Sequence, residues 1–356
     1  SDLIIGGIIT AILGVFFAHD ILELLGTDPK VMHLALPYVQ WMLAGSPLLF
    51  VYIIYTSILR GVGDSTTPLL ALALTSVIGV IITPILLKGY FGFPALGIIA
   101  PAIASIISYI AILIFLAIYL NKKNHSLRPN RQLLQHIRHN PELSKIILRL
   151  GVPTGIQMIT TSMAGLVIVG LVNHYGSHAT AAYGAVNQVL NYIQFPSISI
   201  SIAASIFAAQ AIGAGKSYLL ARVTRTALGM NFLFTGALIA LGYLFSKYLM
   251  ALFITDPTVV VLGQQLLFIV LWAILFFGAG AIFASIMRAS GTVTVPMLIN
   301  ISAILFIEIP CAYWFSSMWG LKGIWVAYAL AFVSLCIIQG LYYQFIWKKK
   351  TIKVLI

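Results

Sequence analysis

The chain has 356 residues, of which 61% are hydrophobic and only 8% carry a charge, and its mean hydropathy is +1.04. Soluble domains carry about 25% charged residues, so this composition excludes an ordinary soluble protein and indicates one that lies largely within a membrane. The formal net charge is +12, a value also found in proteins that bind nucleic acid, but the positions of the basic residues argue against nucleic acid as a partner.

Ten apolar segments follow one another along the chain, and each can cross a hydrocarbon core about 30 Å thick. The backbone finds no water to bond in that core, so we predict that every segment is a helix. No alternation of period two indicates a barrel. The predicted spans are 3–26, 34–60, 68–88, 95–120, 144–173, 180–213, 218–245, 258–288, 294–316 and 320–347. The sequence thus predicts an all-α polytopic membrane protein.

The first two of these spans belong to an internal repeat, because residues 17–68 recur at residues 245–296. Both copies carry the same landmarks at an offset of 228, namely Phe17 and Phe245, Thr27-Asp28-Pro29 and Thr255-Asp256-Pro257, Arg60 and Arg288, Gly63 and Gly291, Thr66 and Thr294, and Pro68 and Pro296. The match continues after a two-residue deletion, with Gly97 paired to Gly323. A long repeat within a membrane protein indicates two helix bundles around a shared central site.

The second copy is preceded by two helices, within residues 141–228, that have no counterpart before Ser1. We therefore expect two further helices ahead of this chain, giving twelve in two parallel six-helix repeats, of which ten are visible here. Parallel repeats follow because six is an even number, so both copies enter the membrane from the same side.

The domain organisation follows from the repeat and from one long polar stretch. Residues 1–120 form the last four helices of an N-terminal bundle, residues 121–143 form a basic linker, and residues 144–356 form a six-helix C-terminal bundle with a short tail. Three histidines of the linker fit no metal-site spacing, so we expect no metal. With ten alternating spans, sixteen of the twenty Lys and Arg residues fall on one side, which predicts that the linker and the C-terminus are cytoplasmic.

Four sequence motifs resemble those of MATE (multidrug and toxic compound extrusion) transporters, and most closely the DinF-like bacterial branch. The motifs are Leu59-Arg60-Gly61-Val62-Gly63-Asp64-Ser65-Thr66-Thr67-Pro68, Leu150-Gly151-Val152-Pro153, Ala181-Ala182-Tyr183-Gly184-Ala185-Val186-Asn187-Gln188 and Gln210-Ala211-Ile212-Gly213-Ala214-Gly215. The first motif resembles that family's loop after the fourth helix, and the second resembles the start of its seventh helix. The third and fourth motifs together resemble its eighth helix and the exit from that helix. The resemblance covers the whole chain from the third helix of that family to the twelfth.

This resemblance implies export of organic, often cationic, compounds, driven by H⁺ or Na⁺ through alternating access. The family's coupling carboxylate lies in a first helix that this chain does not contain. Acids that other members carry on the seventh, tenth and fifth helices correspond here to Thr161, Phe277 and Thr83. These departures put ion coupling in the C-terminal bundle in doubt and favour an ion site in the N-terminal bundle, partly outside this chain.

Glu308 is the only one of the eight acidic residues that lies well inside a predicted span. A charged side chain at mid-membrane costs about 2.5–3.5 kcal/mol on insertion scales, so it usually faces a cavity or a partner. We interpret Glu308 as an ion-coupling residue. The alternative is a structural role, in which it accepts a hydrogen bond from a neighbouring helix or reaches the membrane interface.

Polar side chains recur every three or four residues along the span 180–213, so they share one helix face. This stripe consists of Tyr183, Asn187, Asn191 and Gln194, and the preceding helix adds Gln157 and Thr161. Uncharged amides and hydroxyls suit a pocket that must release its ligand, and we predict that these six residues bind substrate. The alternative is hydrogen bonding between helices, worth about 0.6 kcal/mol per contact.

Arg60 and Arg288 occupy equivalent loops, and each is followed by Gly and Pro. We predict that they form a cytoplasmic gate, latching the closed state by binding the ends of neighbouring helices. The alternative is that they serve only as positive-inside topology signals.

Together these features predict a secondary active antiporter that exports small organic compounds or drugs in exchange for H⁺ or Na⁺. We expect a monomer in the bacterial inner membrane, with no cofactor besides the coupling ion and with no enzymatic activity, since no catalytic pattern lies within the spans. Two alternatives remain: a lipid-linked oligosaccharide flippase of the same superfamily, and an inactive fragment.

Overall fold

The computed structural model describes residues 2–24, 29–124, 127–128 and 141–349. The chain divides into two compact units, residues 1–144 (unit 1) and residues 145–356 (unit 2). Asp28 and most of the predicted linker lie outside the described residues. So do the basic residues Lys350 and Lys353 near the C-terminus. No strand occurs in the described ranges, so the prediction of an all-α protein is confirmed.

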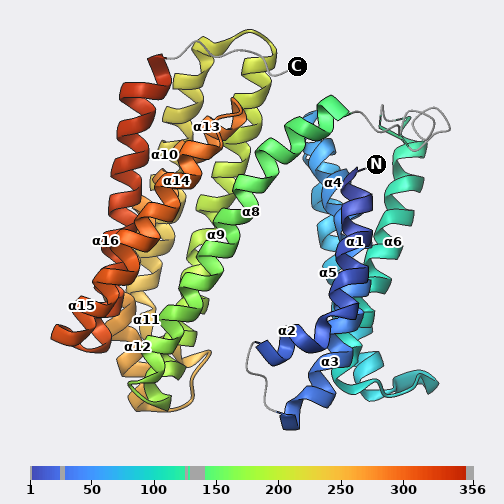
Figure 1. Cartoon of the computed structure of the whole chain (residues 1–356), viewed down its shortest axis with the longest axis horizontal. Helices are drawn as coiled ribbons and strands as arrows, with labels where there is room; N and C mark the ends of the chain where they lie inside the picture. The colour runs from blue at the N-terminus through green and yellow to red at the C-terminus, as the bar shows by residue number, and fades with distance from the viewer. Residues whose placement is uncertain (1, 25–28, 125–126, 129–140, 350–356) are drawn as a thin grey trace. The chain divides into compact units, whose positions relative to one another are not determined.

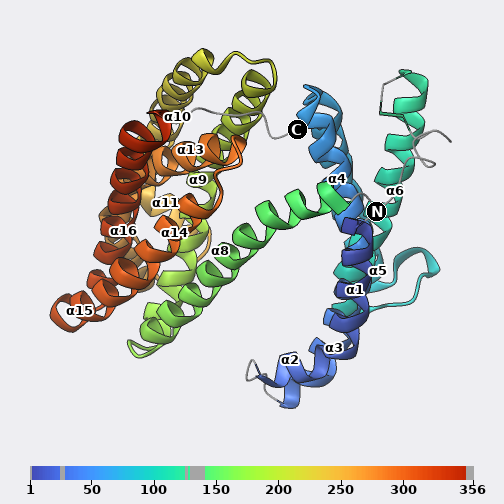
Figure 2. The ribbon, with the colours of Figure 1, turned by 45° about the horizontal axis from the view of Figure 1, so that its top comes forward.

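Unit 1 consists of α-helices joined by short turns (Figures 1 and 2). Its elements are α1 (Asp2–Phe16), α2 (Ala18–Leu24), α3 (Pro29–Ala44), α4 (Ser46–Gly61), α5 (Thr66–Lys88), η1 (Tyr90–Gly92), η2 (Gly97–Ile99) and α6 (Ala100–Lys122). Within this unit α5 packs along α6, and α1 packs along α3 and α4. A small core of Leu59, Ala71, Ile112, Leu116 and Leu120 joins α4, α5 and α6.

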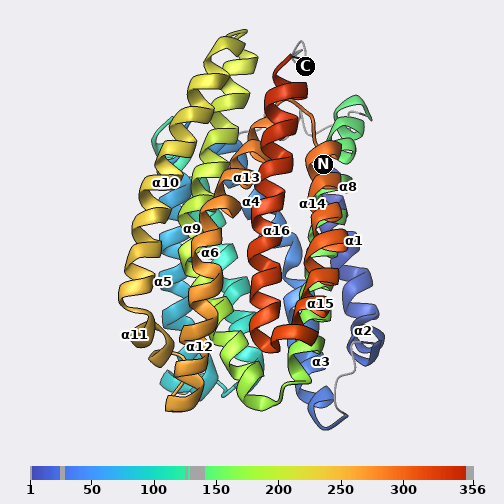
Figure 3. The same ribbon diagram turned by 90° about the vertical axis from the view of Figure 1, so that its left-hand side faces the viewer.

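Unit 2 is a bundle in which α9, α10, α13 and α16 run alongside one another (Figures 1 and 3). Its helices are α8 (Pro141–Asn173), α9 (Ser177–Gly213), α10 (Leu220–Leu244), α11 (Ser246–Ala251), α12 (Pro257–Val270), α13 (Ile274–Ala289), α14 (Thr294–Ala303), α15 (Ile309–Trp319) and α16 (Leu321–Leu341). Shorter turns are η3 (Ser217–Leu219), η4 (Leu271–Ala273), η5 (Ile304–Glu308), η6 (Tyr342–Ile346) and η7 (Trp347–Lys349). Of these, η5 and η6 are π turns.

Eight helices of the described residues are long and apolar enough to cross a membrane. A ninth arises if Val31–Ala44 and Ser46–Gly61, which meet at a bend of 42°, form one span. At the place of the first predicted span lies a shorter apolar helix, Gly6–Phe16. The chain is therefore a polytopic membrane protein, and the number of ten spans stays a prediction.

The internal repeat recurs in the helix boundaries at the same offset of 228. Helices α2, α3, α4 and α5 begin at residues 18, 29, 46 and 66, and α11, α12, α13 and α14 begin at residues 246, 257, 274 and 294. Gly63 and Gly291 both adopt positive φ, at 93° and 82°, in the turn before α5 and α14. Because residues with a Cβ rarely adopt that conformation, both copies use glycine for the same turn.

A buried polar cluster joins α9, α10 and α13 within unit 2. The Ser197 hydroxyl donates to Oδ1 of Asn231 at 2.7 Å and lies 2.9 Å from the Thr235 hydroxyl. Nδ2 of Asn231 donates to the Leu275 carbonyl at 3.1 Å. All three polar side chains are fully buried. Bonding among them satisfies groups that would otherwise lie unpaired in apolar surroundings.

Candidate functional site

A cavity of about 190 Å³ lies among α8, α13, α14, η5 and α16 of unit 2. Its lining comprises Gln157, Thr161, Phe277, Asn300, Ala303, Ile304, Glu308, Ala331, Phe332 and Leu335. Pockets that hold drug-sized ligands measure about 300–1,000 Å³. The cavity is therefore suited to an ion or a few waters, and it is too small for a drug-sized molecule.

Glu308 ends the π turn η5, in which the N–H of Ile309 bonds to the Ile304 carbonyl five residues earlier. A π turn takes up one residue more than a turn of α-helix, and such turns frequently occur at functional sites. The additional residue brings Asn300 and Glu308, eight positions apart, to the same cavity. The protein thus places a carboxyl and an amide oxygen on one wall.

Asn300 contributes an amide oxygen, Oδ1, that is buried and has no hydrogen-bond partner within the described part of the chain. A buried acceptor without a partner costs about 1–3 kcal/mol, which a bound cation or water would offset. Glu308 is half-buried, and its carboxyl group makes no hydrogen bond or ion pair in the described ranges. Both groups offer oxygen atoms, the ligands that hard cations prefer.

Gln157 and Thr161 reach the cavity from α8, where they lie one helical turn apart. The Thr161 hydroxyl donates to the Gln157 carbonyl at 3.0 Å, which leaves the oxygen lone pairs of that hydroxyl available. Two of the six predicted substrate-binding residues therefore share a cavity with the predicted ion-coupling residue.

Tyr183 joins this region through Tyr328 of α16, since the two hydroxyl oxygens lie 3.0 Å apart. Tyr328 is also close enough to Glu308 for an electrostatic interaction. The ring of Tyr183 packs against Trp325, which is fully buried, at 5.4 Å between centroids. These contacts hold α9 against α16 beside the cavity.

The remaining stripe residues of α9 do not line this cavity. Asn187 is half-buried and donates from Nδ2 to the Tyr183 carbonyl of its own helix at 3.1 Å. Asn191 is exposed, and Gln194 is half-buried. The structure therefore separates the six predicted substrate-binding residues into a pair in the cavity and a series along α9.

Arg60 and Arg288 end α4 and α13 at equivalent positions of the repeat. Arg60 makes a long contact from Nη2 to the Ser57 hydroxyl of its own helix, at 3.4 Å. Next to Arg288, Trp347 donates from Nε1 to the hydroxyls of Ser290 and Thr292, at 3.1 and 3.3 Å. These bonds tie the loop after α13 to η7, which follows α16 and η6.

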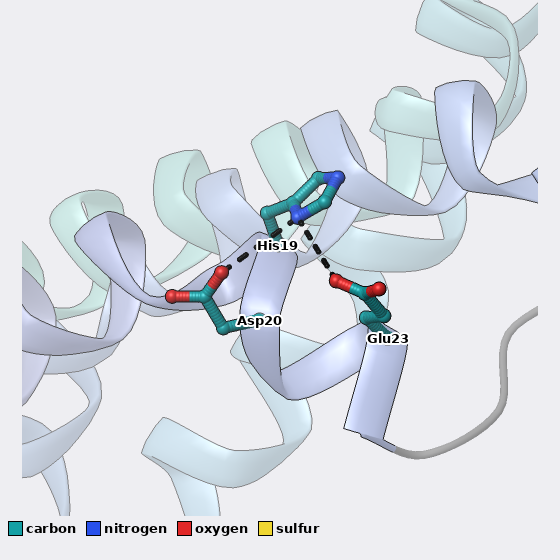
Figure 4. Close-up of side chains that lie close together, drawn as sticks. All are labelled: His19, Asp20 and Glu23. Carbon is teal, nitrogen blue, oxygen red and sulfur yellow. Dashed lines mark ion pairs between the residues drawn. The ribbon is translucent and has the colours of Figure 1, made fainter.

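Two further groups of polar side chains lie apart from the cavity. On α2, Nδ1 of His19 lies 3.8 Å from an Asp20 oxygen and 3.9 Å from a Glu23 oxygen (Figure 4). All three side chains are more than half exposed, and such surface pairs contribute about 0–1 kcal/mol. We assign no function to this cluster.

The second group belongs to an open pocket of about 620 Å³ between the start of α9 and the loop before α12. His178 and Asp256 face each other there at 3.8 Å. Hydrogen bonds from the hydroxyl and the N–H of Thr258 hold the pKa of Asp256 below its usual value. Asp256 also caps α12, so its carboxylate has a structural role.

Sequence reasoning missed Asn300, Phe332 and Tyr328 as residues of this site. Asn300 was detectable as a polar side chain within an apolar span, but eight residues of a regular α-helix leave two side chains about 80° apart, and the sequence does not reveal the π turn that aligns Asn300 with Glu308. In the sequence, Tyr328 resembles an ordinary aromatic residue of a membrane span, because the sequence does not show its contact with Tyr183.

Comparison with known proteins gives a consistent result. A family model described as MatE matches residues 3–85 and 153–314. The chain is 44% identical over 353 residues to the protein named "Probable multidrug resistance protein YoeA" of Bacillus subtilis, covering 98% of this chain and 76% of that protein. It is 26% identical over 315 residues to a protein of Shewanella oneidensis named "FAD transporter", covering 88% of this chain and 69% of the other.

Solved structures resemble the fold as well. A structure titled "Outward-facing conformation of a multidrug resistance MATE family transporter of the MOP superfamily" superposes with a TM-score of 0.88. The two chains are 20% identical, and the match covers 96% of this chain and 76% of the other.

Proposed function

Because this chain belongs to the MatE family of membrane transporters, we propose that it exports small organic compounds in exchange for an inward-moving cation, H⁺ or Na⁺. In such an antiporter the cation and the substrate bind with different affinities to the outward-open and inward-open states. Binding of either ligand thereby shifts the populations of the outward-open and inward-open states to which the other ligand binds.

The observation that carries this proposal is the cavity around Glu308. This cavity is too small for an organic substrate, and Glu308 lies within the span Thr294–Trp319. The cavity brings together one carboxyl group, two amide groups and one hydroxyl group. A carboxyl group in that position costs several kcal/mol unless it has a function or a partner. We assign the cavity to the coupling ion.

Glu308 and Asn300 are the proposed ligands, with Gln157 and Thr161 completing the oxygen set from α8. For proton coupling, the Glu308 carboxylate takes up a proton and loses its charge. For sodium coupling, the carboxylate, the Asn300 oxygen and the Thr161 hydroxyl bind Na⁺ as hard oxygen ligands. In either case the charge of the carboxylate is neutralised when the ion binds.

The proposed substrate site lies along α9, at Tyr183, Asn187, Asn191 and Gln194. Their uncharged side chains suit neutral or cationic compounds, and the name of the Bacillus subtilis relative, a probable multidrug resistance protein, supports this class. A dinucleotide such as that named for the Shewanella relative carries negative charge, whereas the four proposed substrate residues on α9 include no cation to bind it. This difference favours drugs over dinucleotides.

The remaining predictions complete the proposal. The strong bias of basic residues supports a bacterial inner-membrane protein with a cytoplasmic C-terminus, and we propose that it functions as a monomer. Arg60 and Arg288, at equivalent helix ends, are proposed as the cytoplasmic gate.

The test is accumulation of a fluorescent organic cation in bacteria that lack their main exporters. We expect cells that express the protein to accumulate several-fold less dye, and we expect the variant Glu308→Gln to lose this effect. Glu23→Gln, at an exposed acid on α2, is the matched control and should export normally. Equal export by wild type and Glu308→Gln, at equal protein levels, would contradict the assignment.

A further inference from the structure

A groove separate from the candidate site lies on unit 2 between α9 and α10, next to η3. Its volume is about 360 Å³. The lining comprises Ile200, Ala203, Ala204, Phe207, Leu219, Arg222, Val223, Thr226, Ala227 and Met230. Eight of these ten residues are apolar, and the only charged one is Arg222. The groove therefore offers a hydrocarbon surface with a single cationic group.

The groove opens on the surface of the bundle, because Phe207 is 61% exposed and Met230 is 47% exposed. With 3.6 residues per turn, Ala203 and Phe207 lie on roughly the opposite side of α9 from Asn187 and Asn191. The groove is thus on a different face of the helix from the proposed substrate site. In a membrane, an apolar surface of this kind meets lipid acyl chains.

The end of unit 2 that holds Arg222 is strongly basic. Its cations are Lys216, Arg222, Arg225, Arg288, Lys348 and Lys349. The hydrogen bonds from Trp347 to the loop after α13, and between Tyr343 and Thr224 at 2.7 Å, bring these helix ends together. Residues 145–349 contain only two acids, Asp256 and Glu308, and neither lies at this end. The local field therefore attracts anions.

We propose that this groove binds an anionic phospholipid, with one acyl chain along Phe207 and Met230 and the headgroup phosphate on Arg222. The guanidinium group of arginine matches phosphate oxygens with paired hydrogen bonds. Basic pockets between spans at a positively charged membrane face are the expected sites for anionic headgroups. The lipid binds between α9 and α10, close to the turn that joins them.

Two features of the groove select a lipid over a soluble anion. The apolar residues form most of the groove, and a free phosphate would leave them without a partner. The groove also lies beside the basic end of the bundle, where the headgroup layer meets the acyl chains of a bilayer. An anion with an attached hydrocarbon chain satisfies both parts of the groove.

The experiment is native mass spectrometry of the purified protein, titrated in detergent with phosphatidylglycerol or with zwitterionic phosphatidylcholine. We expect one phosphatidylglycerol to bind with clear preference over phosphatidylcholine. Arg222→Gln should weaken this binding about fivefold, the equivalent of about 1 kcal/mol for one basic residue near an anionic headgroup. The exposed Ala203→Phe should weaken it too, by filling the groove.

Arg225→Gln is the matched control, because Arg225 is exposed at the same helix end but does not line the groove. It should bind phosphatidylglycerol as the wild type does. Equal losses for Arg222→Gln and Arg225→Gln without any loss for Ala203→Phe would indicate general surface attraction and overturn the proposal. Equal binding of both lipids would overturn it as well. Unchanged thermal unfolding of each variant excludes misfolding as the cause of any loss.

Discussion

At the scale of single residues, polar atoms inside a membrane span are tolerated only where they have a partner or a function. Glu308 and the Asn300 oxygen lie in the same cavity, and in the described ranges neither accepts a hydrogen bond. Each would be costly in hydrocarbon, so a shared ion that meets both explains why they occur together better than two separate structural roles.

Replacing Asn300 by Ala should weaken binding of the coupling ion without abolishing transport. Loss of one oxygen ligand, worth about 1–3 kcal/mol, raises the ion concentration for half-maximal transport about 5-fold to about 150-fold. The measurement is the transport rate against Na⁺ concentration and pH. Ser302→Ala, at an exposed position of the same helix, should leave both dependences unchanged; identical curves for Asn300→Ala would remove Asn300 from the site.

Asp64 offers a stability prediction at the start of α5. Its carboxylate accepts hydrogen bonds from the N–H groups of Thr66 and Thr67, at 3.1 and 3.0 Å, and from both hydroxyls. Partial burial opposes ionisation, but these bonds outweigh it and hold the pKa of Asp64 below its usual value of 3.8. We expect Asp64→Ala to destabilise the protein by about 1 kcal/mol at neutral pH, the usual effect of losing a helix cap.

The pH dependence of this effect follows from the lowered pKa. The stabilisation by Asp64 is fully present above about pH 4 and is lost as the pH falls through the lower pKa of the folded state. Thermal unfolding in detergent should therefore separate wild type from Asp64→Ala at pH 7, and the two midpoints should converge as the pH falls below the lowered pKa of Asp64 in the folded state. Curves that stay apart at low pH would show that the cap does not depend on the charge.

Sequence reasoning found Glu308, Gln157 and Thr161 because polar side chains stand out in apolar spans. It placed Gln157 and Thr161 on the preceding helix and predicted that they bind substrate together with the α9 stripe, and the structure brings them to the cavity with Glu308. Spacing along one helix indicates a shared face, but contacts between helices depend on packing that the sequence does not display.

At the scale of elements, the repeat predicts helix positions well and helix breaks poorly. The predicted span 34–60 is divided at Gly45, and the following helix has Pro47 in its first turn, a residue that lacks an N–H group. The equivalent span 258–288 is interrupted by the turn η4, yet no proline lies there. A proline thus marks the helix break in the first copy of the repeat, whereas no proline marks the break in the second copy.

Gly278 of α13 gives a prediction about how elements pack. A Cβ at this position would overlap the Asn231 amide and the Ser197 hydroxyl of the buried polar cluster. We expect Gly278→Ala to destabilise the protein by about 1–3 kcal/mol, because the cluster joins α9, α10 and α13 and has no room to shift. The measurement is the free energy or midpoint of unfolding in detergent.

Gly236→Ala is the matched control for Gly278→Ala. Its Cβ would lie 3.9 Å from the Leu275 side chain, an ordinary contact. Since alanine favours helix by about 0.5–1 kcal/mol over glycine, this variant should be as stable as wild type or more so. If both variants unfold alike, the polar cluster is not the tight junction that its hydrogen bonds indicate.

At the scale of the whole molecule, charge placement and the repeat make the fold predictable. Composition gives the membrane class, and the alternation of apolar segments gives helices at the observed positions, because a bilayer leaves the backbone no other solution. The sequence does not give the π turn at Ile304–Glu308 or the cavity that it completes. Those features arise where α16 packs against the turn, and residues of α8, α13 and α14 complete the lining of the cavity.

The orientation proposed from the basic residues can be tested with single cysteines. In a background with Cys311 and Cys336 replaced by serine, Ser217→Cys places a thiol at the basic end of unit 2, and Ser177→Cys places one at the start of α9. A membrane-impermeant maleimide should label Ser177→Cys in intact cells, and it should label Ser217→Cys only after permeabilisation. The opposite pattern would reverse the orientation.

The most direct test of the central claim is transport by the purified protein in liposomes across an imposed H⁺ or Na⁺ gradient. We predict that one of these gradients drives an organic cation in the opposite direction. We also predict that Glu308→Gln lowers this gradient-driven rate at least about tenfold, whereas Glu308→Asp retains part of it. Gradient-driven transport by Glu308→Gln at the wild-type rate would contradict the assignment of the cavity to the coupling ion.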